Sequence, residues 1–70
     1  MRWFEEQRQN WIAEMLWIYG FIGREQLQRK FGISTAQAAI DFRTFQDEHP
    51  GAMKYNLSAK RYEAVQGSLP

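Results

Sequence analysis

The sequence predicts a mainly α-helical domain that ends in a small β-hairpin. Residues 5–19 and 35–48 contain no glycine or proline and repeat apolar side chains at helical intervals. A shorter helical stretch, residues 24–31, lies between them and ends at a glycine. Residues 53–65 instead alternate in the manner of two strands joined by a tight turn. With 70 residues in total, these elements make one small domain.

Composition supports a packed core and excludes several classes of protein. Hydrophobic residues make up 44% of the chain and aromatic residues 16%. The chain has no cysteine and one histidine, so we expect no disulfide, no metal site and no cofactor. Acidic residues occupy the N-terminal segment, and no run approaches the roughly 18 apolar residues of a membrane span. We therefore expect a cytoplasmic protein that does not contact membranes.

The first predicted helix, Glu5 to Tyr19, carries more apolar surface than one buried face needs. Its inward stripe consists of Ile12, Met15, Leu16 and Tyr19 at i, i+3, i+4 and i+7. Gly20 suits the end of the helix. Three further apolar residues fall outside this stripe, namely Trp11, Trp17 and Ile18. Two interpretations stay open: either the domain packs around several sides of the helix, or the extra surface docks a dimer partner or another domain.

The next segment predicts two helices joined by a tight turn. Residues 21–23 form a short apolar link that could pair as a minimal strand with the hairpin. The second helix runs over 24–31, and Gly32 ends it in the left-handed conformation that glycine adopts without steric cost. Ser34 is a good N-cap for the third helix, with its hydroxyl accepting from the backbone N–H of Gln37.

The third predicted helix, Thr35 to Glu48, has an inner apolar side and an outer side suited to DNA. Ala38, Phe42 and Phe45 face the core. On the outer side, Gln37 can pair with adenine, and Ile40 can touch a thymine methyl group. The candidate DNA contacts of this region are Ser34, Thr35, Gln37, Ala39, Ile40, Arg43 and Thr44. Alanine-rich helices are also common in packed bundles, which is the competing interpretation.

The hairpin that follows favours the DNA-binding interpretation. Its strands cover residues 53–56 and 61–65, and its turn covers 57–60. A basic hairpin after a third helix is the wing of a winged helix-turn-helix, which contacts the phosphate backbone or the minor groove. The candidate wing contacts are Lys54, Ser58, Lys60 and Arg61, with the last two placed at the tip. The alternative is an ordinary solvated hairpin.

Motifs along the turn, the third helix and the hairpin resemble those of a known family. They are Phe31-Gly32-Ile33-Ser34, Gln37-Ala38, Asp41, Phe45-Gln46, Pro50, Tyr55-Asn56, Ser58 and Lys60-Arg61-Tyr62-Glu63-Ala64. Over about residues 8 to 66 the chain resembles the N-terminal winged-helix domain of WYL-domain transcriptional regulators. The resemblance is strongest to the branch that represses phage-defence islands, and more distant to DeoR-type repressors.

This resemblance implies a dimeric repressor that binds double-stranded DNA at an inverted repeat. By position it assigns Ser34, Thr35, Gln37 and Arg43 to the recognition helix, and Ser58, Lys60 and Arg61 to the wing. Ala39 stands where the family commonly has serine, and Phe42 replaces a leucine. We expect a DNA-binding domain over residues 1–66 and a linker or cut end over 67–70. The family's ligand-sensing and dimerising domains would follow this domain, so two interpretations stay open: the chain is an excised domain whose dimerisation could depend on them, or it is a stand-alone small protein.

The sequence argues against catalysis and leaves protein binding as the alternative function. Catalysis fails on the available residues, because Glu5-Glu6 and Asp47-Glu48 are sequence neighbours that point to different helix faces. His49, the only imidazole, falls at a predicted helix C-terminus, where a capping role is expected. The remaining competitor is a winged helix that binds protein through its tryptophan-rich first helix.

Overall fold

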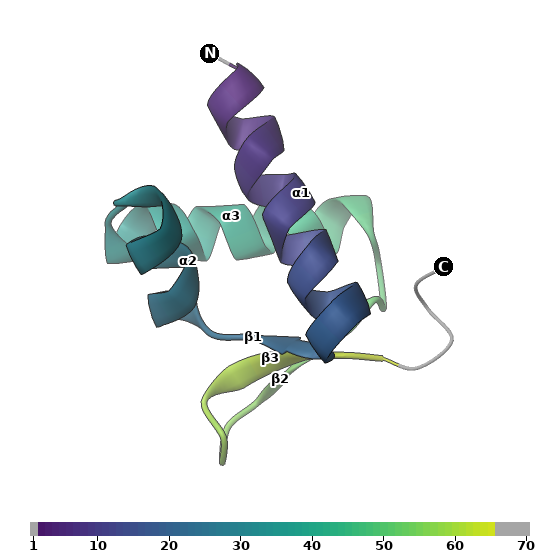
Figure 1. Ribbon diagram of the computed structural model, residues 1–70. Coiled ribbons are helices and arrows are strands. Elements are labelled where there is room, and N and C mark those ends of the chain that lie inside the picture. The colour runs from purple at the N-terminus through teal and green to yellow at the C-terminus, as the bar shows by residue number, and fades with distance from the viewer. Residues whose placement is uncertain (1, 66–70) are drawn as a thin grey trace.

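The structure is a computed structural model that describes residues 2–65 and contains three helices and three short strands. In chain order, the elements are α1 (Arg2–Tyr19), β1 (Phe21–Ile22), α2 (Arg24–Phe31), α3 (Thr35–Glu48), β2 (Met53–Asn56) and β3 (Arg61–Ala64). α1 crosses α3, α2 lies beside them, and the sheet lies beneath the three helices (Figure 1). The predicted fold class is confirmed. The expected linker at 67–70 lies outside the described residues.

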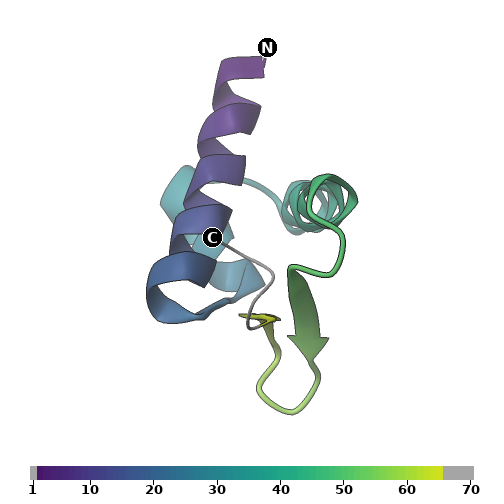
Figure 2. The same cartoon turned by 90° about the vertical axis from the view of Figure 1, so that its right-hand side faces the viewer.

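The three strands form an antiparallel sheet in the order β1-β3-β2. Ile22 of β1 and Tyr55 of β2 both pair with Tyr62, which places β3 in the centre. The predicted pairing of the short link with the hairpin is therefore confirmed. Because β1 joins α1 to α2, this pairing fixes the base of the hairpin to the helices, while its turn projects away from them (Figure 2).

A single core lies between the helices and the sheet. It consists of Ile12, Leu16, Ile22, Leu27, Ala38, Phe42, Phe45, Ala52 and Met53, together with the charged residue Asp41. The ring of Phe42 stacks on that of Tyr62 at 4.2 Å between centroids, which ties α3 to the central strand. The predicted inner face of α3 is confirmed.

The helix ends follow the predicted local chemistry. Gly32 adopts a φ of 65°, and its N–H donates to the carbonyl of Gln28 at 2.7 Å. The Ser34 hydroxyl accepts from the backbone N–H of Gln37 at 3.1 Å, as expected for an N-cap. At the other end of α3, the backbone N–H of His49 donates to the carbonyl of Phe45. The turn between α2 and α3 is therefore fixed on both sides, by Gly32 and by Ser34.

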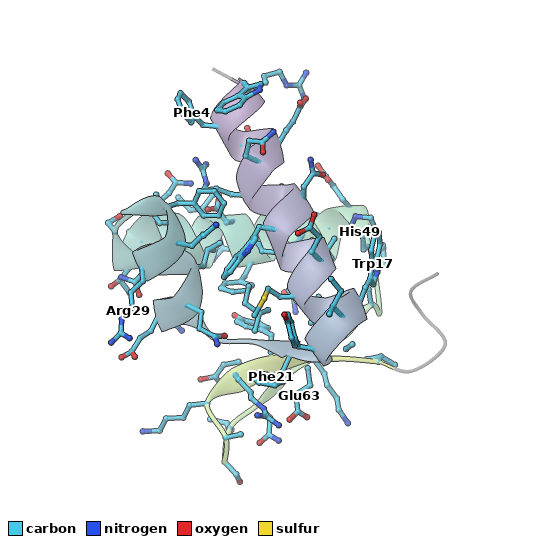
Figure 3. The ribbon with its side chains drawn as sticks, viewed as in Figure 1. Phe4, Trp17, Phe21, Arg29, His49 and Glu63 are labelled. Carbon is cyan, nitrogen blue, oxygen red and sulfur yellow. The ribbon has the colours of Figure 1, made fainter. Side chains whose placement is uncertain are left out.

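α1 begins three residues earlier than predicted and has a large exposed apolar surface. Phe4 lies near the N-terminal end of α1 (Figure 3). Its ring centroid is 4.9 Å from that of Trp3, and both side chains are exposed. The sequence interpretation was wrong for Tyr19, which is 64% exposed because it is the last residue of the helix, where the chain turns at Gly20 into β1. Trp11 packs edge-on against Phe31 of α2. Trp17 and Ile18, in contrast, are exposed.

Candidate nucleic-acid interface

The outer side of α3 is an exposed strip of small and apolar side chains with one long cation. Successive residues of an α-helix are rotated by about 100°, so Ala36, Ile40 and Arg43 lie opposite the buried Ala38 and Phe42. Ala36, Ala39, Ile40 and Arg43 are all exposed, and we call these four residues the α3 ridge. Its small side chains allow the helix backbone to approach a surface closely. Arg43 supplies a charge at the end of the strip.

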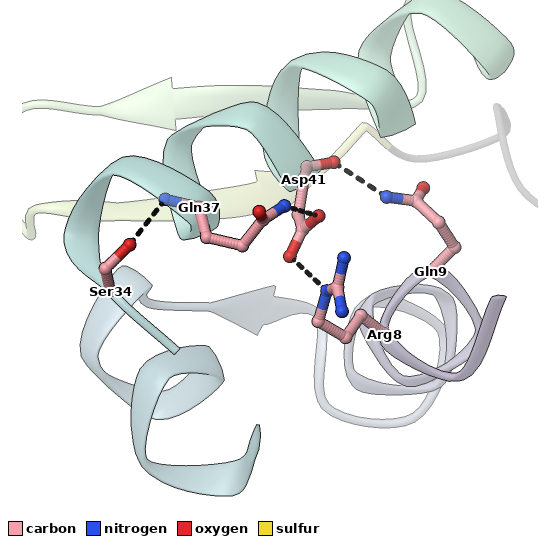
Figure 4. Close-up of polar contacts among 5 residues, drawn as sticks. All are labelled: Arg8, Gln9, Ser34, Gln37 and Asp41. Atoms are coloured by element: carbon pink, nitrogen blue, oxygen red, sulfur yellow. Dashed lines mark hydrogen bonds and ion pairs between the residues drawn. The ribbon is translucent and has the colours of Figure 1, made fainter. Parts of the chain in front are cut away.

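Gln37 lies beside this ridge rather than on it. It is half-buried, and its side-chain Nε2 donates to Oδ1 of Asp41 at 3.0 Å (Figure 4). Its backbone N–H is held by Ser34. The predicted adenine-reading residue is therefore anchored within the protein. One amide N–H and the Oε1 atom remain to contact a ligand.

Asp41 links α3 to α1, a contact that sequence reasoning did not predict. It is 2% exposed, and its Oδ2 lies 2.6 Å from Nε of Arg8. Its backbone carbonyl accepts from Nε2 of Gln9 at 2.8 Å. We call Arg8, Gln9, Gln37 and Asp41 the Asp41 junction (Figure 4). The sequence did contain one indication of this contact. Asp41 lies three residues after Ala38 and directly before Phe42, so helical spacing places its carboxylate near the buried face, where it needs a partner.

The remaining predicted contacts on α3 differ in accessibility. Ser34 and Thr35 are exposed at the N-terminus of the helix, where backbone N–H groups and the helix dipole favour an anion. The Thr35 hydroxyl accepts from Nε2 of Gln28 at 3.0 Å and keeps its own proton to donate. Thr44 is half-buried. The two residues at the start of the helix are therefore better placed than Thr44 to meet a phosphate.

The turn of the hairpin is a well-defined structure. Oδ1 of Asn56 accepts from the backbone N–H of Ala59 at 3.0 Å, which closes the turn. Lys60 adopts a φ of 55°, a left-handed conformation that is uncommon outside glycine. Lys54, Ser58 and Lys60 are exposed, and within residues 2–65 neither lysine has a salt-bridge partner. These two lysines are the accessible charges of the wing.

Arg61 is not at the hairpin tip, which corrects the sequence interpretation. It is the first residue of β3, its Nε donates to Oε2 of Glu63 at 3.0 Å, and its guanidinium lies 4.1 Å from the Phe21 ring centroid. Phe21 and Glu63 sit opposite each other on paired strands (Figure 3). Hydrogen bonds from Arg61 and then Asn56 lower the pKa of Glu63 below its ordinary value of 4.5. The charge of Arg61 is therefore partly balanced inside the hairpin.

A groove brings the start of α3 and the wing together. It has a volume of about 660 Å³, and its lining includes Thr35, Tyr55, Lys60 and Arg61. Arg24, at the N-terminus of α2, also lines this groove, and sequence reasoning missed it. Predicted contacts from two distant segments thus share one surface. Ile40, Arg43 and Thr44 lie outside the groove, farther along α3.

This combination defines a class of protein. Two helices joined by a tight turn, followed by a β-hairpin anchored on a short strand, make a winged helix-turn-helix, a fold of DNA-binding transcriptional regulators.

The comparisons with known proteins identify the family. The model of the BrxR transcriptional regulator winged helix-turn-helix domain matches residues 5–67, and the chain belongs to this family. This agrees with the resemblance found in the sequence. The family is one of transcriptional regulators and not of enzymes. A search of curated proteins found no match. No helix within residues 2–65 is long and apolar enough to cross a membrane.

Proposed function

We propose that this domain binds double-stranded DNA sequence-specifically, as part of a cytoplasmic transcriptional repressor, with α3 in the major groove and the wing on the backbone or in the minor groove. The observation that carries the proposal is the shared groove, in which Thr35 of α3 and Lys60 of the wing face the same space. A duplex backbone seated there would meet the N-terminus of α3 and the cations of the wing together.

The exposed residues divide into base-reading and backbone-binding groups. Ile40, which is 53% exposed, is suited to a thymine methyl group, with Ala39 allowing close approach. Arg43 would contact a guanine edge or a phosphate, and Thr44 would lie at the margin of the interface. The backbone contacts would come from polar or basic side chains that carry little sequence information: Ser34, Thr35, Lys54, Ser58, Lys60 and Arg61.

We infer that two copies bind an inverted repeat, since a two-fold dimer reads two half-sites related by symmetry. The exposed apolar residues of α1, among them Trp17 and Ile18, support a protein contact through this helix. The same surface supports the second candidate function, a winged helix that docks on another protein.

A fluorescence-anisotropy titration against random duplexes, followed by the selected sequences, tests the proposal at two salt concentrations. We expect sequence-selective binding that weakens as salt rises, because phosphate contacts release counterions. The variant Lys54→Glu/Lys60→Glu should abolish binding, since both lysines are exposed and lack a salt-bridge partner within residues 2–65. Circular dichroism checks that the variant is folded, because Lys54 lies opposite Glu63 in the hairpin. The matched control, Trp17→Glu, should leave binding by the monomer intact. If the wild-type chain binds no duplex at low salt, the protein-docking function is favoured.

A further inference from the structure

We propose that Asp41 is a positioning residue for DNA recognition, because it fixes the orientation of the Gln37 side-chain amide. The two residues are one helical turn apart on α3, and Nε2 of Gln37 donates to Oδ1 of Asp41 at 3.0 Å. This inference rests on the proposed function and on the contact between Gln37 and adenine that the sequence predicts. It adds a role for a buried residue that touches no DNA.

The chemistry of Asp41 permits only one orientation of the amide. An ionised carboxylate accepts hydrogen bonds and donates none, so the nitrogen of the Gln37 amide must face it and the oxygen must face away. Among residues 2–65, Oε1 of Gln37 makes no hydrogen bond, and the second N–H is also left over. These two groups form an acceptor next to a donor. That pair complements the N6 amino group and N7 of adenine, whereas guanine presents two acceptors at the same edge.

Asp41 can hold the amide because Asp41 is itself held from α1. Its second carboxylate oxygen lies 2.6 Å from Nε of Arg8, and its backbone carbonyl accepts from Gln9 (Figure 4). The carboxylate is 2% exposed, so water does not compete for it. The backbone N–H of Gln37 is separately bonded to Ser34. Gln37 is thus fixed at both its backbone and its side chain before DNA arrives.

The first test compares base preference in Asp41→Asn with that of the wild type. Asparagine is nearly the same size, but its own amide donates, so it allows the Gln37 amide to flip. The variant Gln37→Ala first identifies the base pair that Gln37 reads. At that base pair, we expect the preference of the protein for its favoured base to fall by about 5- to 150-fold. At that base pair, Asp41→Asn should lower the preference for adenine over guanine at least about fivefold. The salt dependence of binding should not change.

Two further variants separate positioning from general loss of structure. Met53→Ala is a matched control, because Met53 is a core residue of β2 outside the Asp41 junction. It should lower the thermal midpoint and leave base preference unchanged. If Asp41→Asn does not fold, the double variant Arg8→Met/Asp41→Leu replaces the buried pair by apolar side chains, an exchange that often preserves stability. It should fold, bind DNA and show the same loss of preference.

Combining Asp41→Asn with Gln37→Ala decides whether the two residues act together. If Asp41 acts through Gln37, the second substitution should add no further loss of preference. Equal weakening on all sequences by Asp41→Asn would overturn the inference and leave a purely structural role. If Gln37→Ala left base preference unchanged, the inference about Asp41 would also be overturned, but the proposed DNA binding would not. Absence of wild-type binding to any duplex would instead reject the proposed function.

Discussion

The Asp41 junction and the wing each contain an arginine paired with a carboxylate, but in opposite environments. Arg8 and Asp41 lie 2.6 Å apart, with side chains that are 14% and 2% exposed. Arg61 and Glu63 lie 3.0 Å apart, with side chains that are 39% and 24% exposed. The first pair joins two helices, whereas the second lies within one strand. The same chemistry is therefore buried at a helix contact in one place and partly exposed to solvent in the other.

Under the proposed function, this difference indicates how the two regions contribute to DNA recognition. A buried charge pair is strongly penalised when either partner is lost, so it fixes how α1 and α3 sit relative to each other. An exposed pair is weak and is screened by salt, so Arg61 can exchange Glu63 for a phosphate at little cost. The junction is thus suited to holding a base-reading helix in place. The wing is suited to binding a charged backbone of variable position.

The largest expected effect comes from breaking the buried pair at one side. Arg8→Met should lower the free energy of unfolding by about 3–5 kcal/mol, because it leaves the Asp41 carboxylate buried without its cation. Urea denaturation followed by circular dichroism measures this loss. The matched control is Arg29→Met, whose partner Glu25 is 4.0 Å away and 85% exposed. It should change stability by less than about 0.5 kcal/mol. Similar losses in both variants would contradict the comparison.

The next effect concerns base discrimination rather than stability. Gln37→Ala should reduce discrimination at one base pair per half-site by about 1–3 kcal/mol, as expected for loss of a two-bond contact. Titrations against duplexes that differ at single base pairs measure it. Since Gln37 is half-buried and Asp41 loses a donor, a small decrease in stability should accompany this change. Equal weakening on every duplex would make Gln37 a backbone contact.

A smaller and sequence-independent effect is expected at the wing. Lys60→Asn removes one charge while suiting the left-handed backbone, since asparagine tolerates a positive φ such as the 55° found here. Binding to every duplex should weaken, and the slope of log K against log salt should decrease in magnitude by about one unit. Anisotropy titrations over a range of salt concentrations give this slope. A change in the preferred sequence would show that the wing reads bases.

The sequence predicted elements well where local chemistry determines them. Gly32 and Ser34 predicted the end of α2 and the start of α3, because a left-handed cap and an N-cap act within a few residues. The alternation around Tyr62 likewise predicted the hairpin. The start of α1 was missed, since Trp3 and Phe4 are exposed and lie outside the apolar stripe used to define that helix.

The site was predicted less completely, because its main contacts join distant parts of the chain. Arg8 and Asp41 are 33 residues apart in sequence, and no local pattern pairs them. Arg61 was expected at the tip as an accessible cation. Its pairing with Glu63 two residues later follows from strand geometry, which places alternate residues on one face. Its contact with Phe21 depends on the register between β1 and β3, which the sequence did not predict.

The smallest expected effect is the pH dependence of the exposed pair. Hydrogen bonds from Arg61 and Asn56 lower the pKa of Glu63, so the folded state binds its proton less readily than the unfolded chain does. The stabilisation is therefore present above the ordinary pKa of 4.5 and is lost as pH falls through the lower folded value. Glu63→Gln should lower the thermal midpoint slightly at pH 7, and the difference from wild type should vanish in acid.

Thermal melts of both proteins between neutral pH and strong acid measure this difference. Glu25→Gln serves as the control, because Glu25 lies 4.0 Å from Arg29 and both side chains are 85% exposed. The thermal midpoint of this variant should follow that of wild type throughout. Added salt should reduce the Glu63 effect, whereas the penalty of Arg8→Met should persist, because ions do not screen a buried pair. The difference in thermal midpoint between Glu63→Gln and wild type could instead stay the same in acid and at high salt. That result would mean that the contacts of Glu63 with Asn56 and Arg61 stabilise the wing without charge. The wing would then be as rigid as the Asp41 junction, and the contrast between the two regions would fail.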